Sequence, residues 1–328
     1  MLISRTPYRI SFFGGGLDYP SWYKKRDTQI LCAGLDYYCY QTVRELPPFF
    51  NHKYRIAYSK IETAQNINEI NHPTAREVIK KYGLGKSLEI THVGDLPSRS
   101  GIGSSSAFTV GLISSLSALV KSEFLGRTKL ANLAIDIEQN DVGETIGVQD
   151  QCASAFGGLV HIHADKEGIK PKRFLIRKEY QEYLESSLLM GFTGKQRFSS
   201  LASKKVNKAI KSENYVSKLE ELHEISQKGI EAIGNESDIL ENAMLTKECR
   251  DIKLSINGDR NDPLIMELIE ESEKAGSLCT RIMGAGGGGF FICWAPKYKH
   301  ESIKSRINVK TWVEVRISAS GSQIIFSE

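Results

Sequence analysis

The sequence has little of what several protein classes require. Its 328 residues include only six cysteines, its net charge is only +4, and no long segment is uninterruptedly apolar. The cysteines lie far apart without a C-x-x-C pair, which predicts reduced thiols and gives no zinc-binding motif. The small net charge argues against a protein that binds nucleic acid through a strongly basic surface. The apolar stretch from Ala107 to Val120 is too short and too rich in serine to span a membrane.

The N-terminus also lacks the apolar core of a signal peptide, because Arg5 and Arg9 interrupt it. We therefore expect a cytoplasmic protein without a membrane partner. No internal repeat or low-complexity segment is present.

The patterning of the chain predicts an α+β protein of two domains. Tyr8–Phe13 and Tyr37–Arg44 read as strands, and Thr74–Tyr82 reads as a short helix. Beyond Asp165 the chain becomes richer in lysine and glutamate, as in the helical region Lys204–Gly234. Strands and helices alternate without a regular βαβα rhythm, which argues against a doubly wound parallel sheet. We place the boundary near residues 165–185 and divide the chain into residues 1–170 and 171–328.

A glycine-serine turn at Pro97–Ala107 leads directly into the apolar segment Phe108–Val120. Gly101 and Gly103 would let the backbone approach an anion, and the start of a helix would point free N–H groups at it. The three serines Ser104–Ser106 could cap that helix, and one hydroxyl could bind Mg²⁺. Taken alone, the segment fits a capped, buried helix equally well.

Two further glycine-rich segments favour the phosphate-binding reading. They are Phe13–Tyr19 and Gly284–Gly289, both far from the first in sequence. Glycine runs weaken strands and helices, so they are expected where backbone passes close to a ligand or to another backbone. Between the segments lie Glu138, at the end of a predicted helix, and Asp150. Phosphoryl transfer needs a metal ligand and a carboxylate near the acceptor hydroxyl, and these two acids are the candidates.

Three other motifs are set aside. Gly85–Ser87 resembles the end of a Walker A loop, but Lys80 stands where that loop needs glycine. The G-x-G-x-x-G pattern of Gly284–Gly289 precedes a strand, whereas a dinucleotide-binding pattern opens a helix. His161 and His163 share a strand face, but with no third metal ligand evident we read them as ordinary strand histidines.

The three glycine segments resemble, in the right order, the three motifs of the GHMP kinase superfamily, which includes galactokinase, homoserine kinase and mevalonate kinase. Thr6–Gly14 matches the first motif, Pro97–Ser106 the second (P-x-x-x-G-[LI]-G-S-S-[AS]) and Gly284–Gly289 the third. Within the superfamily, Arg5–Asp18 and Phe192–Arg197 resemble the heptose 7-phosphate kinases, which make precursors of nucleotide-activated heptoses. The resemblance implies an N-terminal ribosomal-protein-S5-domain-2-like domain and a C-terminal ferredoxin-like α/β domain.

The resemblance also implies roles for individual residues. Asp150 matches the catalytic aspartate, and Arg9 stands where many members place a basic residue beside it. Glu138 matches the Mg²⁺-binding glutamate, with Ser104 or Ser105 as the second metal ligand. The residues implied to bind the nucleotide are Ser100, Gly101, Ile102, Gly103, Ser104, Ser105, Ser106, Gly286 and Gly287.

For the acceptor, the resemblance implies contacts from Gly15, Gly16 and Asp18. Galactokinases carry G-E-H-x-D here, and the absence of that acid and histidine argues against galactose. A phosphorylated sugar needs cations at its far end. The candidates are Lys195 and Arg197, with Arg99 as a further possibility, although all of these could equally be surface charges.

The sequence thus predicts an ATP- and Mg²⁺-dependent kinase that phosphorylates the anomeric hydroxyl of D-glycero-D-manno-heptose 7-phosphate. Its partners would be small molecules, a nucleotide and a sugar phosphate. The alternatives are a fucose-type sugar 1-kinase, a non-catalytic sugar sensor on the same fold and, ranked lower, a decarboxylase. The oligomeric state and the base of the nucleotide are left open.

Overall fold

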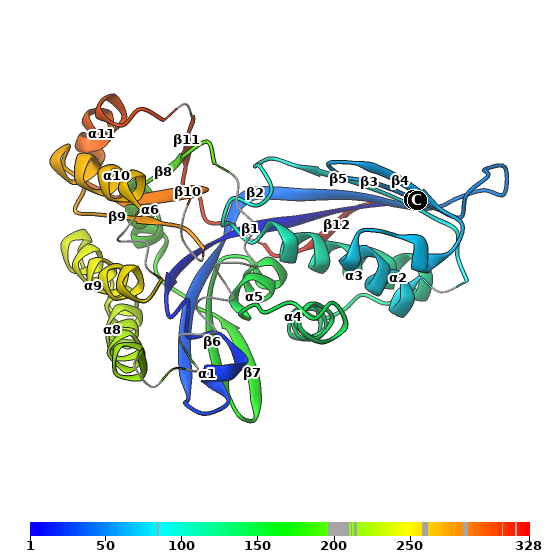
Figure 1. Ribbon diagram of the computed structural model, residues 1–328, viewed down its shortest axis with the longest axis horizontal. Coiled ribbons are helices and arrows are strands. Elements are labelled where there is room, and N and C mark those ends of the chain that lie inside the picture. Colours follow the sequence, from blue (N-terminus) through cyan, green and yellow to red (C-terminus); the bar gives the residue numbers. More distant parts are fainter. Residues whose placement is uncertain are drawn as a thin grey trace.

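The computed structural model of the protein forms two sheets, each with its own helices (Figure 1). It describes residues 1–83, 85–195, 210, 212, 215–257, 262–284, 288–309, 311–318 and 320–328. The α+β architecture predicted from the sequence is confirmed. The division at residue 170 remains a prediction.

The first sheet contains eight strands and is mostly antiparallel. Its main path runs β12-β1-β2-β5-β3-β4, and β6 pairs with both β2 and β7. The long strand β2 makes this branching possible, because its first half pairs with β6 and its second half with β5. The strands are β1 (Leu2–Phe13), β2 (Thr28–Glu45), β3 (Tyr54–Ala57), β4 (Ile61–Ala64), β5 (Leu88–Gly94), β6 (Leu159–Asp165), β7 (Gly168–Arg173) and β12 (Gln323–Ser327).

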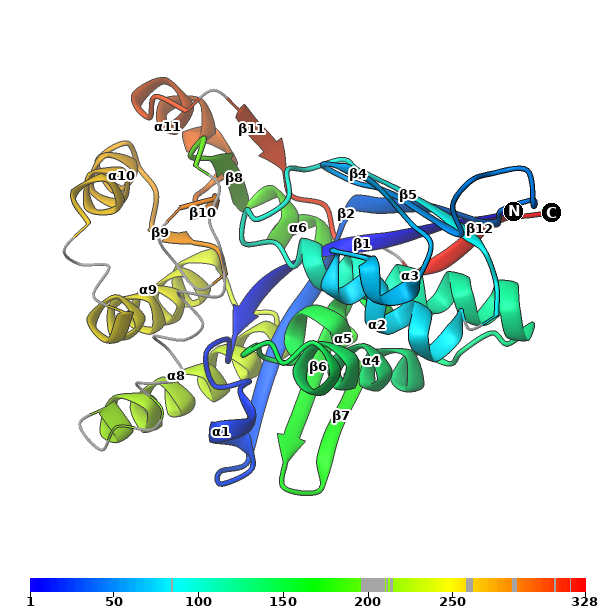
Figure 2. The same ribbon diagram turned by 45° about the vertical axis from the view of Figure 1, so that its right-hand side comes forward.

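Helices cover one face of this sheet (Figures 1 and 2). At the centre lies α3, whose middle turns are buried on nearly all sides against β1, β2 and the neighbouring helices. This burial matches its sequence, which is apolar or small all round instead of striped. The helices and short turns of this half are α1 (Pro20–Tyr23), η1 (Ile67–Glu69), α2 (Pro73–Tyr82), α3 (Ser104–Lys121), α4 (Arg127–Asp136), η2 (Ile137–Asp141) and α5 (Gln149–Phe156).

The second sheet is antiparallel, with the strand order β11-β8-β10-β9. Helices connect β8 to β9 and β10 to β11, which is the ferredoxin-like arrangement expected for the C-terminal half. Its strands are β8 (Leu188–Phe192), β9 (Cys279–Ile282), β10 (Phe290–Trp294) and β11 (Thr311–Glu314). Its helices are α6 (Lys178–Ser186), α8 (Val216–Gly234), α9 (Ile239–Asn257), α10 (Pro263–Lys274), η5 (Lys297–Lys299) and α11 (His300–Arg306).

The two halves are joined in two ways. The last strand, β12, returns to the first sheet and pairs with β1, so the two termini lie side by side (Figure 2). Helices α8 and α9 also contact β1. The end of β1 therefore faces both halves, and the candidate site lies there.

Several sequence expectations can be checked directly. All six cysteines are free and buried, as expected for reduced thiols. In the part of the chain that the structure describes, no helix is long and apolar enough to cross a membrane. The predicted helix over Lys204–Gly234 is present as α8 from Val216, and most of its earlier residues lie outside the described ranges.

Candidate active site

A cavity opens where β1, α3, α5 and the second half of the chain meet. It brings together most of the predicted site residues from segments far apart in sequence. Its lining includes Arg9, Gly15, Gly16, Asp18, Gly101, Gly103, Ser104, Ser105, Ser106 and Asp150. It also includes residues to which the sequence analysis assigned no role, namely Ser11, Tyr19, Glu144, Gln149, Gln151, Lys253 and Arg281.

The centre of the site is an ion pair between Arg9 and Asp150. The Arg9 guanidinium donates from Nε to Oδ1 of Asp150 at 2.5 Å and from Nη2 to Oδ2 at 3.1 Å. Arg9 is 4% exposed, and the Asp150 carboxylate raises the pKa of Arg9 against the opposing effect of burial. A two-point contact of this kind fixes the plane of the carboxylate. Asp150 lies in the first turn of α5, where the helix dipole favours a negative charge.

A bulge in β1 ties this ion pair to the glycine-serine turn. The pairing of β1 with β2 is irregular between Pro7 and Arg9, because proline has no N–H for the ladder. The backbone N–H of Arg9 donates to the carbonyl of Ile102 at 3.0 Å, and its Nη1 donates to the carbonyl of Gly101 at 2.7 Å. One arginine therefore holds the catalytic candidate and the turn together.

The turn has the geometry of an anion cradle. Gly101 and Gly103 have φ angles of +83° and +72°, which glycine adopts without strain. Gly103 occupies the N-cap position of α3, and no side chain caps the helix. The expectation that Ser104–Ser106 act as caps is therefore wrong, because these serines lie inside the first turn. The backbone N–H groups of that turn have no side-chain acceptor, which suits an anionic ligand.

Two residues predicted to bind the nucleotide point elsewhere. Ser100 is buried, and its hydroxyl donates to the carbonyl of Pro97. The Ile102 side chain is also buried, and neither residue lines the cavity. Their observed role is to hold the shape of the turn.

The second and third glycine segments pack backbone against backbone. A Cβ on Gly101 would lie 2.7 Å from the carbonyl oxygen of Met283, and a Cβ on Gly284 would lie 3.0 Å from Cα of Gly101. The N–H of Phe290 donates to the carbonyl of Ser100 at 2.9 Å. These glycines are thus required for close packing of the two segments. Gly286 and Gly287, which were predicted to bind the nucleotide, lie outside the described residues.

Glu138 lies behind the turn, on the π-helical stretch η2 that follows α4. Its carboxylate is 1% exposed and accepts hydrogen bonds from Ser106 at 2.8 Å, from Thr109 at 2.5 Å and from Gln151. Burial raises the pKa of Glu138 to about 7, against the effect of these hydrogen bonds. Among the described residues no cation pairs with it.

An uncompensated buried carboxylate surrounded by hydroxyls is a donor set that suits Mg²⁺. The serine that contacts Glu138 is Ser106, whereas the sequence pointed to Ser104 or Ser105. Ser104 accepts a hydrogen bond from the Arg99 backbone, and Ser105 is exposed at the cavity wall. Glu138 itself does not line the cavity, because Ser106 and Gln151 lie between its carboxylate and the cavity. Which serine would bind a metal stays a prediction.

Asp18 is buried beside the first glycine segment. Its Oδ1 accepts from the N–H of Gly16 at 2.9 Å, and its Oδ2 accepts from the N–H groups of Val148 and Gln149 at 3.2 and 3.4 Å. Burial raises the pKa of Asp18, against the effect of these backbone hydrogen bonds. The carboxylate thus fixes the loop against the start of α5, and it lines the cavity. Its predicted contact with a sugar hydroxyl is compatible with this place.

Of the three cations predicted to bind the far end of the acceptor, only Arg99 is found among the residues that line the cavity. Lys195 is exposed and does not line the cavity, and Arg197 lies outside the described residues. Lys253 of α9 and Arg281 of β9 line the cavity instead. No sequence signal could single them out, since both are isolated basic residues in ordinary helix and strand patterns. Gln149 and Gln151 could have been found, because they flank Asp150.

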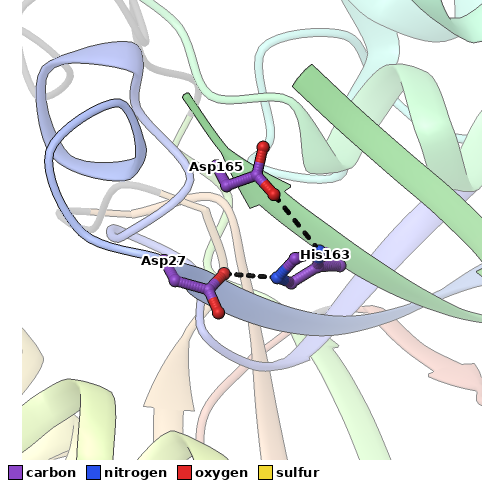
Figure 3. Close-up of side chains that lie close together, drawn as sticks. All are labelled: Asp27, His163 and Asp165. Atoms are coloured by element: carbon purple, nitrogen blue, oxygen red, sulfur yellow. Dashed lines mark ion pairs between the residues drawn. The ribbon is translucent and has the colours of Figure 1, made fainter. Parts of the chain in front are cut away.

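His163 belongs to a separate charged cluster at the end of the β6–β7 hairpin (Figure 3). Its Nε2 pairs with Asp27 and its Nδ1 lies 3.7 Å from Oδ2 of Asp165, so it does have the acidic neighbours that the sequence did not reveal. Asp165 also pairs with Lys170 at 3.1 Å. The two ring nitrogens face different carboxylates, and His161 bonds Gln29 instead. The arrangement is a network of partly exposed charges that links the hairpin to the residue before β2.

Comparison with known proteins agrees with this site. The GHMP kinases N terminal domain matches residues 68–158, which contain the turn, Glu138 and Asp150. A D-glycero-alpha-D-manno-heptose 7-phosphate kinase of Campylobacter jejuni is 27% identical over 92% of both chains. A mevalonate kinase of Thermococcus onnurineus is 28% identical over 76% of this chain and 72% of its own.

Among solved structures, a D-glycero-D-manno-heptose 1-phosphate kinase from Bacteroides thetaiotaomicron superposes over the whole of both chains, with a TM-score of 0.79 and 21% identity. This likeness shows a common fold. The sequence match, the shared fold and the assembled motifs define the class: residues 68–158 match the N-terminal domain of the GHMP kinases, and the chain is similar to members of this superfamily over most of its length. Within it, the chain is similar to the heptose phosphate kinases along nearly its full length, and it is a kinase.

Proposed function

We propose that the protein transfers the γ-phosphoryl group of ATP to the anomeric hydroxyl of D-glycero-D-manno-heptose 7-phosphate. The acceptor oxygen forms a bond to the γ-phosphorus while the bond to the bridging oxygen of ADP breaks. The hydroxyl proton passes to the Asp150 carboxylate. The products are the 1,7-bisphosphate and ADP.

The observation that carries this proposal is the Arg9–Asp150 pair at the edge of the glycine-serine turn. A Cβ on Gly103 would lie 3.2 Å from the Asp150 carboxylate, so the turn and the acid are in direct contact. A phosphate held at the start of α3 would therefore lie beside Asp150 and the Arg9 guanidinium. Asp150 can orient the acceptor hydroxyl and take its proton, while Arg9 balances negative charge that develops during transfer.

Mg²⁺, when bound with the nucleotide, neutralises charge on its phosphates. Glu138 is the residue that would hold it, with a hydroxyl from Ser104, Ser105 or Ser106. The first turn of α3 would hold the β- and γ-phosphates through its backbone N–H groups. Because an anomeric hydroxyl is more acidic than other sugar hydroxyls, Asp150 could act mainly by positioning the acceptor.

The acceptor side of the cavity suits a polyhydroxylated molecule. The hydroxyl of Ser11 and the amide oxygen of Gln149 are buried there, and neither has a hydrogen-bond partner among the residues that the structure describes. Buried polar atoms of this kind are normally satisfied, so a ligand with several hydroxyls is a fitting partner. The heptose 7-phosphate kinase similarity extends over more of the chain than the mevalonate kinase similarity, which favours a sugar phosphate acceptor.

The proposal is tested by incubating the protein with Mg-ATP and a panel of acceptors. The panel contains heptose 7-phosphate, the unphosphorylated heptose, fucose and mevalonate, and ADP release and product mass are measured. We expect turnover of the heptose phosphate, with the new phosphate located on the anomeric carbon by NMR. Preferred turnover of fucose or mevalonate would replace the proposed acceptor. No turnover of any acceptor would favour the sensor alternative.

Asp150→Asn tests the role of the carboxylate. Removing a general base typically costs about 10²- to 10⁴-fold in rate, and the asparagine keeps the size of the side chain. We expect kcat to fall within that range while the KM for ATP changes little. A wild-type kcat at saturating substrates would show that Asp150 does not act as a base.

A further inference from the structure

Two cations in the cavity wall form no ion pair with any carboxylate in the described part of the chain. They are Lys253 of α9 and Arg281 of β9. Within the described ranges, the Lys253 ammonium forms no hydrogen bond or ion pair. Arg281 donates from Nη2 to the carbonyl of Ser11, and its Nε is buried without a hydrogen-bond partner. Among the residues that the structure describes, no carboxylate therefore pairs directly with either of these two positive charges, and Asp18 acts on Lys253 without forming an ion pair.

The two cationic residues that are most fully buried in the described part of the chain, Arg9 and Arg250, are paired with acids. Arg9 is held by Asp150. Arg250, one turn before Lys253 on α9, pairs with Asp251 at 2.9 Å and with Glu273 at 2.5 Å. Pairing is the usual arrangement, because an unpaired charge away from water is costly. Lys253 and Arg281 lack this pairing, and both line the cavity.

The electrostatic cost is visible at Lys253. Its pKa is lowered to about 8, mainly by burial and also by the neighbouring Arg281 and Arg9, while Cys249 and Asp18 oppose the effect. Burial lowers the pKa of Arg281 as well. An anion bound between the two side chains would relieve both effects. Two uncompensated positive charges match the charge of a phosphate monoester dianion.

The position of the two cations points to the acceptor. A Cβ on Gly16 would lie 3.7 Å from Cε of Lys253, and Arg281 holds the carbonyl of Ser11. Ser11 and Gly16 belong to the segment assigned above to the acceptor. The nucleotide-binding turn, in contrast, meets the Arg9–Asp150 pair at Gly103.

We propose that Lys253 and Arg281 bind the terminal phosphate of the acceptor and make the kinase specific for phosphorylated sugars. The inference rests on the proposed function, and it assigns to these residues the role that the sequence suggested for Lys195 and Arg197. A sugar that carries its phosphate here would be anchored at one end while its anomeric hydroxyl reaches Asp150 at the other. Without the phosphate, the sugar would lose this anchor and the two charges would stay unbalanced.

The test uses the full-length protein and the variants Lys253→Met, Lys253→Arg and Arg281→Met. The control is Lys247→Met, because Lys247 lies on the same helix but pairs with Glu273 at 3.2 Å and does not line the cavity. Steady-state rates are measured for heptose 7-phosphate, for the unphosphorylated heptose and for ATP. Independently, the midpoint of thermal unfolding is measured with and without inorganic phosphate.

We expect Lys253→Met and Arg281→Met to raise the KM for heptose 7-phosphate about thirtyfold or more, as when one partner of a buried charge pair is removed. The KM for ATP and the kinetics of the unphosphorylated heptose should stay within about twofold of wild type, and Lys253→Arg should restore most of the affinity. An unchanged KM for the sugar phosphate would overturn the inference and leave the proposed function intact. A parallel rise in the KM for ATP would also overturn it, because the cations would then bind the nucleotide.

The thermal measurement separates the two claims. If no sugar is phosphorylated but inorganic phosphate stabilises the wild type and not Lys253→Met, the anion site is supported and the proposed function fails. If phosphate stabilises both proteins equally, these cations do not form the anion site.

Discussion

Replacing Lys253 by methionine should stabilise the protein while it weakens substrate binding. Methionine resembles the aliphatic stem of lysine in length and flexibility, so the substitution removes the charge and little packing. The reason to expect a gain is that the half-buried lysine ammonium forms no ion pair with an acid of the described residues, in a wall that also holds Arg281. A structural lysine would show the opposite effect.

The size of the gain follows from the pKa. The pKa of Lys253 falls from an ordinary 10.5 to about 8 on folding. At roughly 1.4 kcal/mol per pH unit, charged Lys253 costs the folded state up to about 3 kcal/mol. The half-buried position and local rearrangement reduce this figure, so we expect a gain of about 1–2 kcal/mol in the free energy of unfolding at pH 7.

The pH dependence gives a second, sharper signature. Below about pH 8 the lysine is charged in both the folded and the unfolded chain, and the full cost is present. Between pH 8 and 10.5 the unfolded chain holds a proton that the folded protein has lost, so the stability contributed by this residue rises with pH. The advantage of Lys253→Met should therefore shrink as the pH is raised from 7 to 9.5.

The assay is thermal and urea-induced unfolding of wild type and variant at pH 7 and pH 9.5, without ligand. Lys247→Met is the matched control, since its half-exposed ion pair with Glu273 is expected to contribute less than about 1 kcal/mol. Loss of stability in Lys253→Met at pH 7, or an advantage that does not change with pH, would refute the reasoning that the charge is uncompensated.

Three other substitutions test the geometry of the site. Gly101→Ala should lower stability by about 1–3 kcal/mol and raise the KM for ATP, because its φ is +83° and a Cβ would lie 2.7 Å from the Met283 carbonyl. The control Gly85→Ala has a φ of +81° with nothing within 4 Å of the added carbon, so an equal loss in both would show that only the backbone angle matters. Glu138→Gln should raise the Mg²⁺ concentration for half-maximal rate at least about tenfold, measured at fixed ATP; the same result in Glu144→Gln would assign the effect to the general charge of the cavity. Arg9→Lys keeps the charge but loses the two-point contact with Asp150, and stopped-flow or steady-state rates should show kcat reduced about 10- to 100-fold. An unchanged kcat would mean that the orientation of the carboxylate is not important.

Much of the candidate site could be predicted from the sequence, because its parts are local. The turn at Pro97–Ala107 contains its own glycines and opens its own helix, and the structure confirms both features. The ion pair between Arg9 and Asp150 could be expected from their motifs. Its two-point geometry and the hydrogen bond from the Arg9 backbone to Ile102 depend on contacts between the bulge in β1 and a segment far along the chain, and a local sequence pattern does not predict such contacts.

The glycine runs fit two structural roles that the sequence could not distinguish. A run of glycines predicts close approach of the backbone to something, and the sequence left open whether this is a ligand or another chain segment. The structure places Gly284 against Gly101, backbone on backbone, whereas Gly16 faces the cavity near Lys253. Local conformational freedom is a property of the residue, but what lies opposite it is decided by the fold.

The amino-acid sequence by itself determined the class of this protein, the α+β architecture and the glycine-serine turn that opens a helix, since periodicity and short motifs act over neighbouring residues. Only the tertiary structure decided which charges are left unpaired. Lys253 and Arg281 lie 28 positions apart on a helix and a strand. The residues around each of them in the sequence do not distinguish it from a solvent-exposed lysine or arginine. Whether a charge is buried, and whether an acid faces it, depends on contacts between distant segments. That is why the sequence placed the cations of the acceptor site at Lys195 and Arg197, and why the fold points to another pair.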